Sequence, residues 1–214
     1  RRHQRWTDLT DRTDDPIELS YRIHSEAERR QLESGVVPEL ITDPGSIDYW
    51  RHERMKNFVD PLLVAHPEST WLTIGDGRYG SDARSLIRKG HETMATSLTD
   101  DCLAFASEQG WIGSFSAENA ESLSLGDDAF DFILCKESFH HFPRPPIALY
   151  EMLRVARLGV VLIEPLESGR NRPLDWAKQK AKRVLRGDAT SLYEPEGNFL
   201  YRADPRSLQK LLAA

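Results

Sequence analysis

This 214-residue sequence predicts an α/β fold with a mostly parallel sheet and helices on both faces. From residue 70 onward, short apolar runs alternate with segments of helical periodicity, which is typical of strands joined by right-handed helical crossovers. Two of these runs suit strands buried on both faces, because 130–135 is rich in phenylalanine, isoleucine and leucine and 159–163 is continuously apolar. A glycine-rich turn at 75–80 directly follows the first run. Together these features indicate an open sheet with a ligand site at its carboxyl edge.

The pattern can be divided into elements along the chain. We expect strands at 70–74, 91–97, 111–116, 130–135 and 159–163, with helices at 81–89, 100–109 and 146–157. Before them, a helix begins at Ser46 or Ile47 and continues to about Ala65, and Pro61 should kink or divide it. This helix either covers one edge of the sheet or caps the cofactor with the side chains of Tyr49, Trp50 and Arg54.

The two ends of the chain are less regular. Residues 1–45 are predicted to be an N-terminal extension that is partly irregular, with a loop around 10–16 and a short helix at 25–34. Residues 46–214 form the main domain, and 166–203 form a substrate-side insertion or lid with a basic helix at 174–186. A final helix is expected from Asp204 to Ala214.

Composition excludes several classes of function. A net charge of -6 argues against general nucleic-acid binding. No apolar run approaches the roughly 20 residues that a membrane-spanning helix needs, and no signal peptide is visible. The two cysteines, Cys102 and Cys135, lie in apolar surroundings without metal-type spacing and are expected to be buried free thiols. A cytoplasmic protein is the expectation.

The glycine turn Gly75-x-Gly77-x-x-Gly80 has the form of a nucleotide-cofactor loop. Glycines let the backbone approach a ligand, and the amides at the start of the following helix favour an anionic group. A nicotinamide-dependent oxidoreductase is one interpretation of this spacing. It requires an acidic residue at the end of the second strand to bind the ribose, and Ser97 stands at that position.

Later segments favour another cofactor. In order and spacing, residues 70–165 resemble the class I S-adenosylmethionine-dependent methyltransferases, specifically their small-molecule methyltransferase-type domains, which have a Rossmann-like fold. The segments that carry the resemblance are 74–77, 119–125, 127–136, 139–142, 150–155 and 160–165.

Three features depart from the family pattern. Thr73 stands two residues before the first glycine, where the family usually has an acid, and Ser97 stands where a second acid usually binds the ribose hydroxyls. A serine cannot give the charge-assisted, bidentate acceptor of a carboxylate. Asp76 and Asp100 are the nearest compensating residues. The family's final antiparallel hairpin is also missing after the last helix, so either further residues or a partner, such as a second copy, should cover the sheet edge.

The resemblance implies S-adenosylmethionine as the cofactor and a role for each matching residue. Gly75, Asp76 and Gly77 would line the methionine end, and Lys136 would face the sulfonium or the acceptor. The ribose and the adenine would lie against Ser97, Leu98, Asn119 and Ala120.

His140 and His141 follow the fourth strand, at the carboxyl edge of the sheet. Histidine titrates near neutral pH, so one of them, preferably His140, is the candidate base that removes the acceptor's proton. Glu137 beside them does not complete a metal site, because no third convergent ligand is evident. The alternative for each histidine is packing or capping.

The predicted function is methyl transfer to a hydroxyl or amine of a small-molecule acceptor, such as a sugar, a nucleotide-sugar or a secondary metabolite. A solvated face is the favoured explanation of the basic helix at 174–186, and the alternative is a lid or docking surface for an anionic acceptor. A non-catalytic methyltransferase-like binding module is the second hypothesis, supported by Thr73 and Ser97. The nicotinamide-dependent oxidoreductase is the third.

Overall fold

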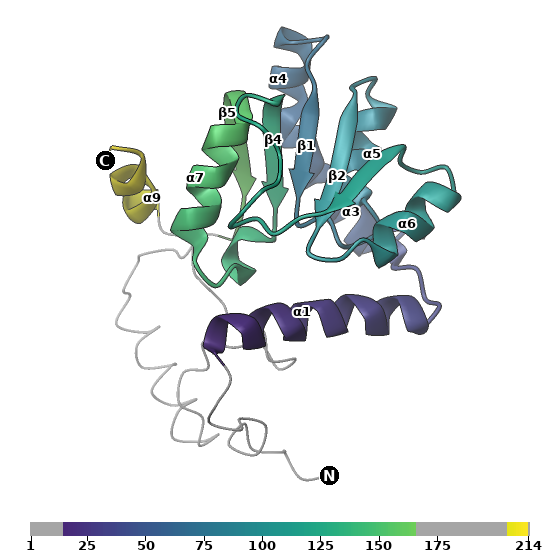
Figure 1. Ribbon diagram of the computed structural model, residues 1–214. Helices are drawn as coiled ribbons and strands as arrows, with labels where there is room; N and C mark the ends of the chain where they lie inside the picture. Colours follow the sequence, from purple (N-terminus) through teal and green to yellow (C-terminus); the bar gives the residue numbers. More distant parts are fainter. Residues whose placement is uncertain (1–14, 166–204, 214) are drawn as a thin grey trace, which may run out of the picture.

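The computed structural model describes residues 15–165 and 205–213, and Figure 1 shows how its elements are arranged. Five strands form one sheet: β1 (Trp71–Ile74), β2 (Thr93–Ser97), β3 (Ser114–Ala117), β4 (Phe130–Lys136) and β5 (Ala156–Ile163). All neighbouring strands are parallel, and their order is β3-β2-β1-β4-β5. The predicted parallel α/β fold is therefore confirmed. The insertion expected at 166–203 lies outside the described residues.

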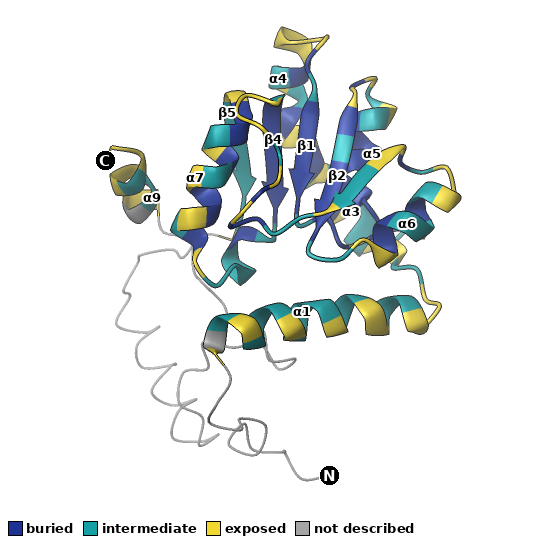
Figure 2. Ribbon diagram, in the orientation of Figure 1, coloured by how far each residue is buried: buried dark blue, intermediate teal, exposed yellow. Residues whose placement is uncertain are grey.

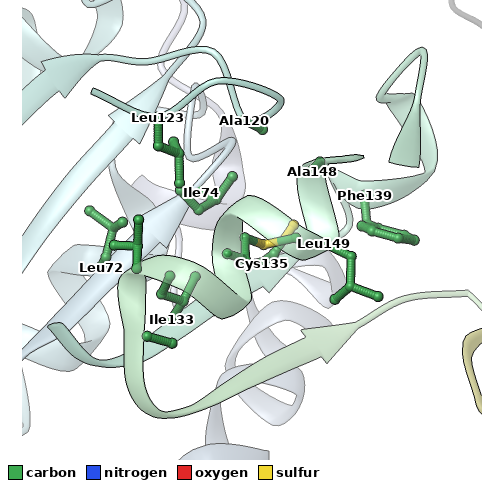
Figure 3. Close-up of a cluster of buried hydrophobic side chains, with 12 residues drawn as sticks. Leu72, Ile74, Ala120, Leu123, Ile133, Cys135, Phe139, Ala148 and Leu149 are labelled. Atoms are coloured by element: carbon green, nitrogen blue, oxygen red, sulfur yellow. The ribbon is translucent and has the colours of Figure 1, made fainter. Parts of the chain in front are cut away.

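One face of the sheet packs against α7 (Pro145–Val155). Alternate residues of β1 and β4 point to this side, as the period of a strand requires. Their apolar side chains meet those of α7 in the cluster drawn in Figure 3, which includes Leu72, Ile74, Ile133, Cys135 and Leu149. This packing fixes β1 and β4, the two strands that carry the glycine turn and the histidine segment.

The opposite face is covered by helices that precede and follow β1. Trp71 stacks on Phe132 of β4, with 4.8 Å between ring centroids. Around this pair pack residues of η2 (Asn57–Val59), α4 (Asp60–Ala65) and α5 (Ser81–Arg88), among them Val59, Leu63 and Leu86. Helices thus lie on both faces of the sheet.

A third apolar cluster joins β2 to α6 (Asp101–Glu108) and the first turn of α5. It contains Ala83, Ala95, Cys102 and Leu103. Both cysteines are buried and neither forms a disulfide, as the sequence predicts. The third strand begins later than expected, at Ser114, because Trp111 instead packs its ring edge-on against Phe105 of α6.

The N-terminal segment is more helical than the sequence predicts. Instead of a short helix at 25–34, α1 spans Pro16–Glu33. Asp15 caps it, since one carboxylate oxygen accepts a 2.9 Å hydrogen bond from the Ile17 amide, and proline in the first helical turn needs no hydrogen-bond partner. A second short helix, α2, spans Glu39–Thr42. The predicted helix at 46–65 is divided into α3 (Ile47–Lys56), η2 and α4, and Pro61 lies in the first turn of α4.

Helix α1 runs across the carboxyl ends of the strands, below the sheet in Figure 1. Its described side chains are half-buried or exposed and none is fully buried, which is visible as alternating teal and yellow in Figure 2. This is the edge at which open parallel sheets bind ligands. The helix α9 (Pro205–Leu212) lies beside α7, where Tyr150 Oη donates a 3.1 Å hydrogen bond to the Leu211 carbonyl. In the described part of the chain, no helix has the length and apolar character to cross a membrane.

Candidate functional site

A cavity of about 470 Å³ lies at the carboxyl edge of the sheet and is lined by the strand ends and by α1. It opens where the strand order reverses, because β2 and β4 flank β1 on opposite sides. The structure brings all ten site residues expected from the sequence to its lining: Gly75, Asp76, Gly77, Ser97, Leu98, Asn119, Ala120, Lys136, His140 and His141.

The loop after β1 adopts a conformation that requires glycine at its first position. Gly75 has a φ of 71°, in the left-handed region that other residues rarely adopt. A Cβ added there would lie 2.5 Å from Ser138 Cβ. Ser138 in turn donates a 2.8 Å hydrogen bond to the Gly75 carbonyl. This contact joins the loop after β1 to the loop after β4 and sets the width of the crevice between them.

Asp76 holds the glycine loop against the start of α5. Its carboxylate accepts hydrogen bonds from the Asp82 amide (3.2 Å), the Ala83 amide (2.9 Å) and the Thr73 hydroxyl (3.0 Å). Burial, followed by the nearby charge of Asp82, raises the pKa of Asp76 to about 7. Thr73 and Asp76 therefore form one buried unit that supports the loop from behind.

Lys136 lies at the other wall of the crevice, in a buried cluster of charged and polar groups. Its Nζ lies 3.1 Å from His52 Nδ1, 3.4 Å from Asp82 Oδ1 and 3.5 Å from Glu137 Oε2. Burial and the charge of Lys136 lower the pKa of His52 to about 4, so its ring is neutral at pH 7 and accepts from the ammonium group. Glu137 has a φ of 52°, a left-handed conformation at the exit of β4.

The residues of α3 that reach the cavity are Arg51 and His52. The alternative in which Tyr49, Trp50 and Arg54 cap the site is wrong. Trp50 is 57% exposed and Arg54 stacks over its ring on the outside of the helix. The spacing of apolar residues in α3 suggested the wrong face of the helix. The face toward the cavity carries a charged side chain and an imidazole, Arg51 and His52.

His140 and His141 belong to the short helix η3 (Phe139–His141) directly after β4. His140 Nδ1 pairs with Glu164 Oε2 at the end of β5. Glu164 is itself held by two backbone amides, because Oε1 accepts from Ser138 (2.9 Å) and Phe139 (2.8 Å). With Nδ1 paired to a carboxylate, Nε2 is the ring nitrogen of His140 left to exchange a proton with a ligand. The rings of His140 and His141 lie 4.0 Å apart between centroids.

The cavity has a wall that sequence reasoning missed. Tyr21, His24, Glu28 and Gln31 of α1 line it, and their spacing of three or four residues places them on one helix face. Tyr21 Oη donates a 2.8 Å hydrogen bond to Glu121 Oε2. Polar residues at helical spacing before the first strand were the available signal, but polar faces usually point to solvent.

Ser97, at the end of β2, contacts this wall directly. Its hydroxyl donates a 2.6 Å hydrogen bond to Glu28 Oε1, and the Thr99 hydroxyl donates one of 2.6 Å to Glu28 Oε2. Burial raises the pKa of Glu28, while these hydroxyl groups act in the opposite direction. The position predicted to lack a carboxylate therefore has one beside it, supplied from another element.

Asn119 and Ala120 follow β3. The exit of β3 is tied to that of β2, because the Glu118 amide donates a 2.7 Å hydrogen bond to the Ser97 carbonyl. Asn119 Oδ1 accepts a 2.9 Å hydrogen bond from the Glu121 amide and so fixes the turn. In the parts of the chain that are described, no group of three or more histidine, cysteine or carboxylate residues is placed to hold a metal ion.

Comparison with known proteins gives independent information on the domain and its fold. A family model described as a methyltransferase domain matches residues 72–163, which span β1 to β5. No curated protein sequence matches the chain.

Solved structures share the fold. YcgJ from Bacillus subtilis is 23% identical with a TM-score of 0.56, and the match covers 76% of this chain and 67% of that one. A SAM-dependent methyltransferase from Methanosarcina mazei is 21% identical with a TM-score of 0.54, covering 72% and 82%. The [4+2]-cyclase SpnF is 22% identical with a TM-score of 0.53, covering 75% and 54%. The chain thus spans about two thirds of the Bacillus protein and about half of the cyclase.

The family model, the strand order and the glycine loop at the point where that order reverses agree with one another. The family model favours S-adenosylmethionine over the nicotinamide-dependent alternative, which rested on glycine spacing alone. Residues 72–163 form a methyltransferase domain with the fold of the class I S-adenosylmethionine-dependent methyltransferases, and S-adenosylmethionine is the cofactor that this domain implies.

Proposed function

We propose that this protein transfers a methyl group from S-adenosylmethionine to a hydroxyl or amine of a small-molecule acceptor, with His140 as the base. The observation that supports this most directly is the pairing of His140 Nδ1 with Glu164 at the wall of the cofactor cavity. A carboxylate on one ring nitrogen fixes the tautomer and orients the other nitrogen for proton transfer.

The cavity fits a polar cofactor of this kind. Two buried nitrogen atoms on its α1 wall, His24 Nε2 and Gln31 Nε2, have no hydrogen-bond partner among the described residues. Buried polar atoms are normally paired, so these positions suit a ligand that carries its own acceptors. Gly75 and Gly77 would hold the methionine end, Ser97 and Leu98 would lie beside the ribose and adenine, and Asn119 and Ala120 would meet the adenine edge.

When bound, S-adenosylmethionine supplies an electrophilic methyl group on a sulfonium sulfur. The positive charge disappears during transfer, so the protein needs alignment more than it needs an oxyanion hole. Correct orientation of two reactants is worth about 7–11 kcal/mol. The buried Lys136 cluster on one side and the η3 segment on the other would hold the acceptor in line with the methyl group.

The acceptor's oxygen or nitrogen forms the new bond to the methyl carbon as the carbon–sulfur bond breaks and its electron pair stays on sulfur. The proton lost by the acceptor moves to His140 Nε2. Glu164 then stabilises the imidazolium, and its two backbone hydrogen bonds keep the carboxylate oriented toward the ring. An amine acceptor that is already neutral needs this base less than a hydroxyl does.

A non-catalytic binding module is the second hypothesis, because Thr73 and Ser97 stand where the family usually has acids. The two hypotheses differ in one observable, the fate of the methyl group. Purified protein is incubated with methyl-labelled S-adenosylmethionine and a fractionated extract of small molecules. The proposed function predicts label in a small-molecule fraction, whereas a binding module leaves all label in the cofactor.

Once a labelled product is found, His140→Ala should lower the rate of transfer by about 10²–10⁴-fold to a hydroxyl acceptor. Cofactor affinity, measured by calorimetry, should change little. Glu164→Gln should give a smaller loss, because the ring would remain in place without a charged partner. His66→Ala is the matched control, since His66 packs on Phe132 near the amino ends of the strands, away from the cavity. Transfer that is unchanged in His140→Ala would show that another group is the base.

A further inference from the structure

Ser97 ends β2 at the place where nucleotide-binding sheets commonly present a carboxylate to ribose hydroxyls. A serine offers one donor and a weak acceptor there. In this structure the carboxylate nearest to that place comes from α1, which lies 69 residues earlier in the sequence. We propose that Glu28 of α1 accepts hydrogen bonds from the ribose hydroxyls of S-adenosylmethionine, so that α1 is part of the cofactor site.

The position of Glu28 is fixed from three sides. Ser97 and Thr99 each donate a 2.6 Å hydrogen bond to a different carboxylate oxygen. The third contact is with the glycine loop, because a Cβ added at Gly77 would lie 2.4 Å from Glu28 Oε1. Glycine at this position therefore makes room for the Glu28 carboxylate, which lies between the glycine loop and the end of β2.

These contacts do not satisfy the carboxylate. The two hydroxyls and a backbone hydrogen bond from Thr99 use three of the roughly four lone-pair sites of the carboxylate, and one is left for a ligand. In the part of the chain that the structure describes, Glu28 forms no ion pair. A buried carboxylate without a cation is unfavourable unless donors compensate for lost water. A vicinal diol offers two donors at the spacing of one carboxylate, and Glu28 lines the same cavity as the glycine loop.

The rest of the α1 face agrees with a ligand-facing role. Tyr21, His24 and Gln31 lie on the same side of the helix as Glu28 and also line the cavity. A helix that merely covered a dry core would present apolar residues at these positions. Helix α1 instead presents an imidazole, a carboxylate and an amide, two of which include buried nitrogen atoms without a partner among the described residues.

Calorimetric binding of S-adenosylhomocysteine tests this assignment without turnover. Glu28→Gln should weaken binding by about tenfold to a hundredfold, the loss expected for one charge-assisted hydrogen bond. Glutamine keeps an oxygen that can accept from Ser97, so the helix should stay docked. Glu26→Gln removes the same charge from the exposed face of α1 and should leave affinity unchanged. Thermal unfolding without ligand shows whether each variant is folded.

Removing ribose hydroxyls from the ligand makes the test specific. The 2′-deoxy and 3′-deoxy analogues of S-adenosylhomocysteine should bind wild type about tenfold or more weakly than the parent. In Glu28→Gln the same deletions should cost much less, because the charged acceptor is already absent. The double variant Glu28→Gln/Ser97→Asp should recover part of the lost affinity, since it places a carboxylate on β2.

Three outcomes would overturn the assignment. Tighter binding in Glu28→Gln would mean that Glu28 competes with the cofactor for its site. Equal costs of hydroxyl deletion in wild type and Glu28→Gln would mean that Glu28 does not contact the ribose. Failure of wild type to bind S-adenosylhomocysteine at millimolar concentration would overturn it as well. The inference rests on the cofactor and not on the acceptor or on His140, so a failed transfer assay leaves this measurement interpretable.

Discussion

Thr73 and Asp76 are joined by a 3.0 Å hydrogen bond from the threonine hydroxyl to Asp76 Oδ2, at the back of the glycine loop. The same oxygen also accepts from the Ala83 amide at 2.9 Å. Thr73 stands where relatives of this family usually have an acid, and here the acid lies three residues later and faces α5. The loop is therefore held by a threonine–aspartate pair, and the strength of that pair can be measured.

Thr73→Val should destabilise the protein by about 1 kcal/mol, because Asp76 loses one of three donors while the side-chain volume is kept. Urea denaturation measures this. Cofactor affinity should change less than twofold, since Thr73 does not line the cavity. Thr73→Ser keeps the hydroxyl and serves as the control. A tenfold loss of affinity in the valine variant, without a matching loss of stability, would contradict this role.

Asp76 should make stability depend on pH. Its folded pKa of about 7 lies above the ordinary aspartate value of 3.8, because burial and the charge of Asp82 disfavour ionisation. The folded state therefore binds the proton more tightly, and this stabilisation is fully present below about pH 4 and lost as pH rises through 7. Relative to Asp76→Asn, the free energy of unfolding of wild type should fall between pH 5 and pH 8.5. A difference that stays flat across this range would show that the pKa is not raised.

Gly75→Ala should weaken both folding and cofactor binding. The left-handed φ of 71° alone costs a non-glycine residue about 1–2 kcal/mol, and the new Cβ would also collide with Ser138. Gly90→Ala separates the two effects, because Gly90 has a φ of 92° but nothing within 4 Å of the added Cβ. We expect a larger loss of stability at Gly75 than at Gly90, and a loss of cofactor affinity only at Gly75. Equal losses in both variants would mean that the collision is relieved without consequence.

Tyr21→Phe should loosen the attachment of α1 over the cavity. The hydroxyl donates to Glu121, which also accepts from the Arg144 amide and side chain. A hydrogen bond to a charged group is worth about 1.5–3 kcal/mol, so the cofactor should dissociate about tenfold faster. Stopped-flow release of S-adenosylhomocysteine measures this rate. Tyr150→Phe is the control, because its hydroxyl contacts α9 rather than α1. Unchanged release would indicate that α1 is held by its other contacts.

Asp131 stabilises the opposite end of the sheet. One carboxylate oxygen accepts from the Thr70 amide at 2.9 Å, and the other accepts from Arg157 Nε at 2.7 Å. The Thr70 amide, followed by Arg157, holds the pKa of Asp131 below its usual range. Its stabilisation is therefore present above about pH 4 and lost as pH falls through the lowered folded pKa.

We expect Asp131→Asn to cost about 1.5–3 kcal/mol at pH 7, and the difference from wild type should shrink below pH 4. Denaturation at pH 7, 4 and 3 measures it. Cofactor affinity should be unchanged, because Asp131 does not line the cavity. A difference that persists undiminished at pH 3 would show that the interaction does not depend on ionised Asp131.

Much of the fold could be predicted because it follows from local sequence patterns. The apolar runs at 132–135 in β4 and 159–163 in β5 favour strands, and the glycines at 75–80 favour a turn, because these preferences depend on residues that are close in the sequence. The order of these segments also placed the expected site residues at one edge, because parallel strands end on the same side of a sheet. Helix α1 was only half predicted, since its inward face is polar and resembles a solvated one.

The side-chain pairs that define the candidate site could be identified only from the tertiary structure. Glu28 meets Ser97 across 69 residues, and His140 meets Glu164 across 24. No periodicity connects such positions, because each pair forms only when separate elements pack and bring their ends together. The sequence alone therefore indicated the α/β fold, the glycine loop and the family. Packing of α1 over the carboxyl edge placed Glu28 beside Ser97, and pairing of β4 with β5 placed His140 beside Glu164.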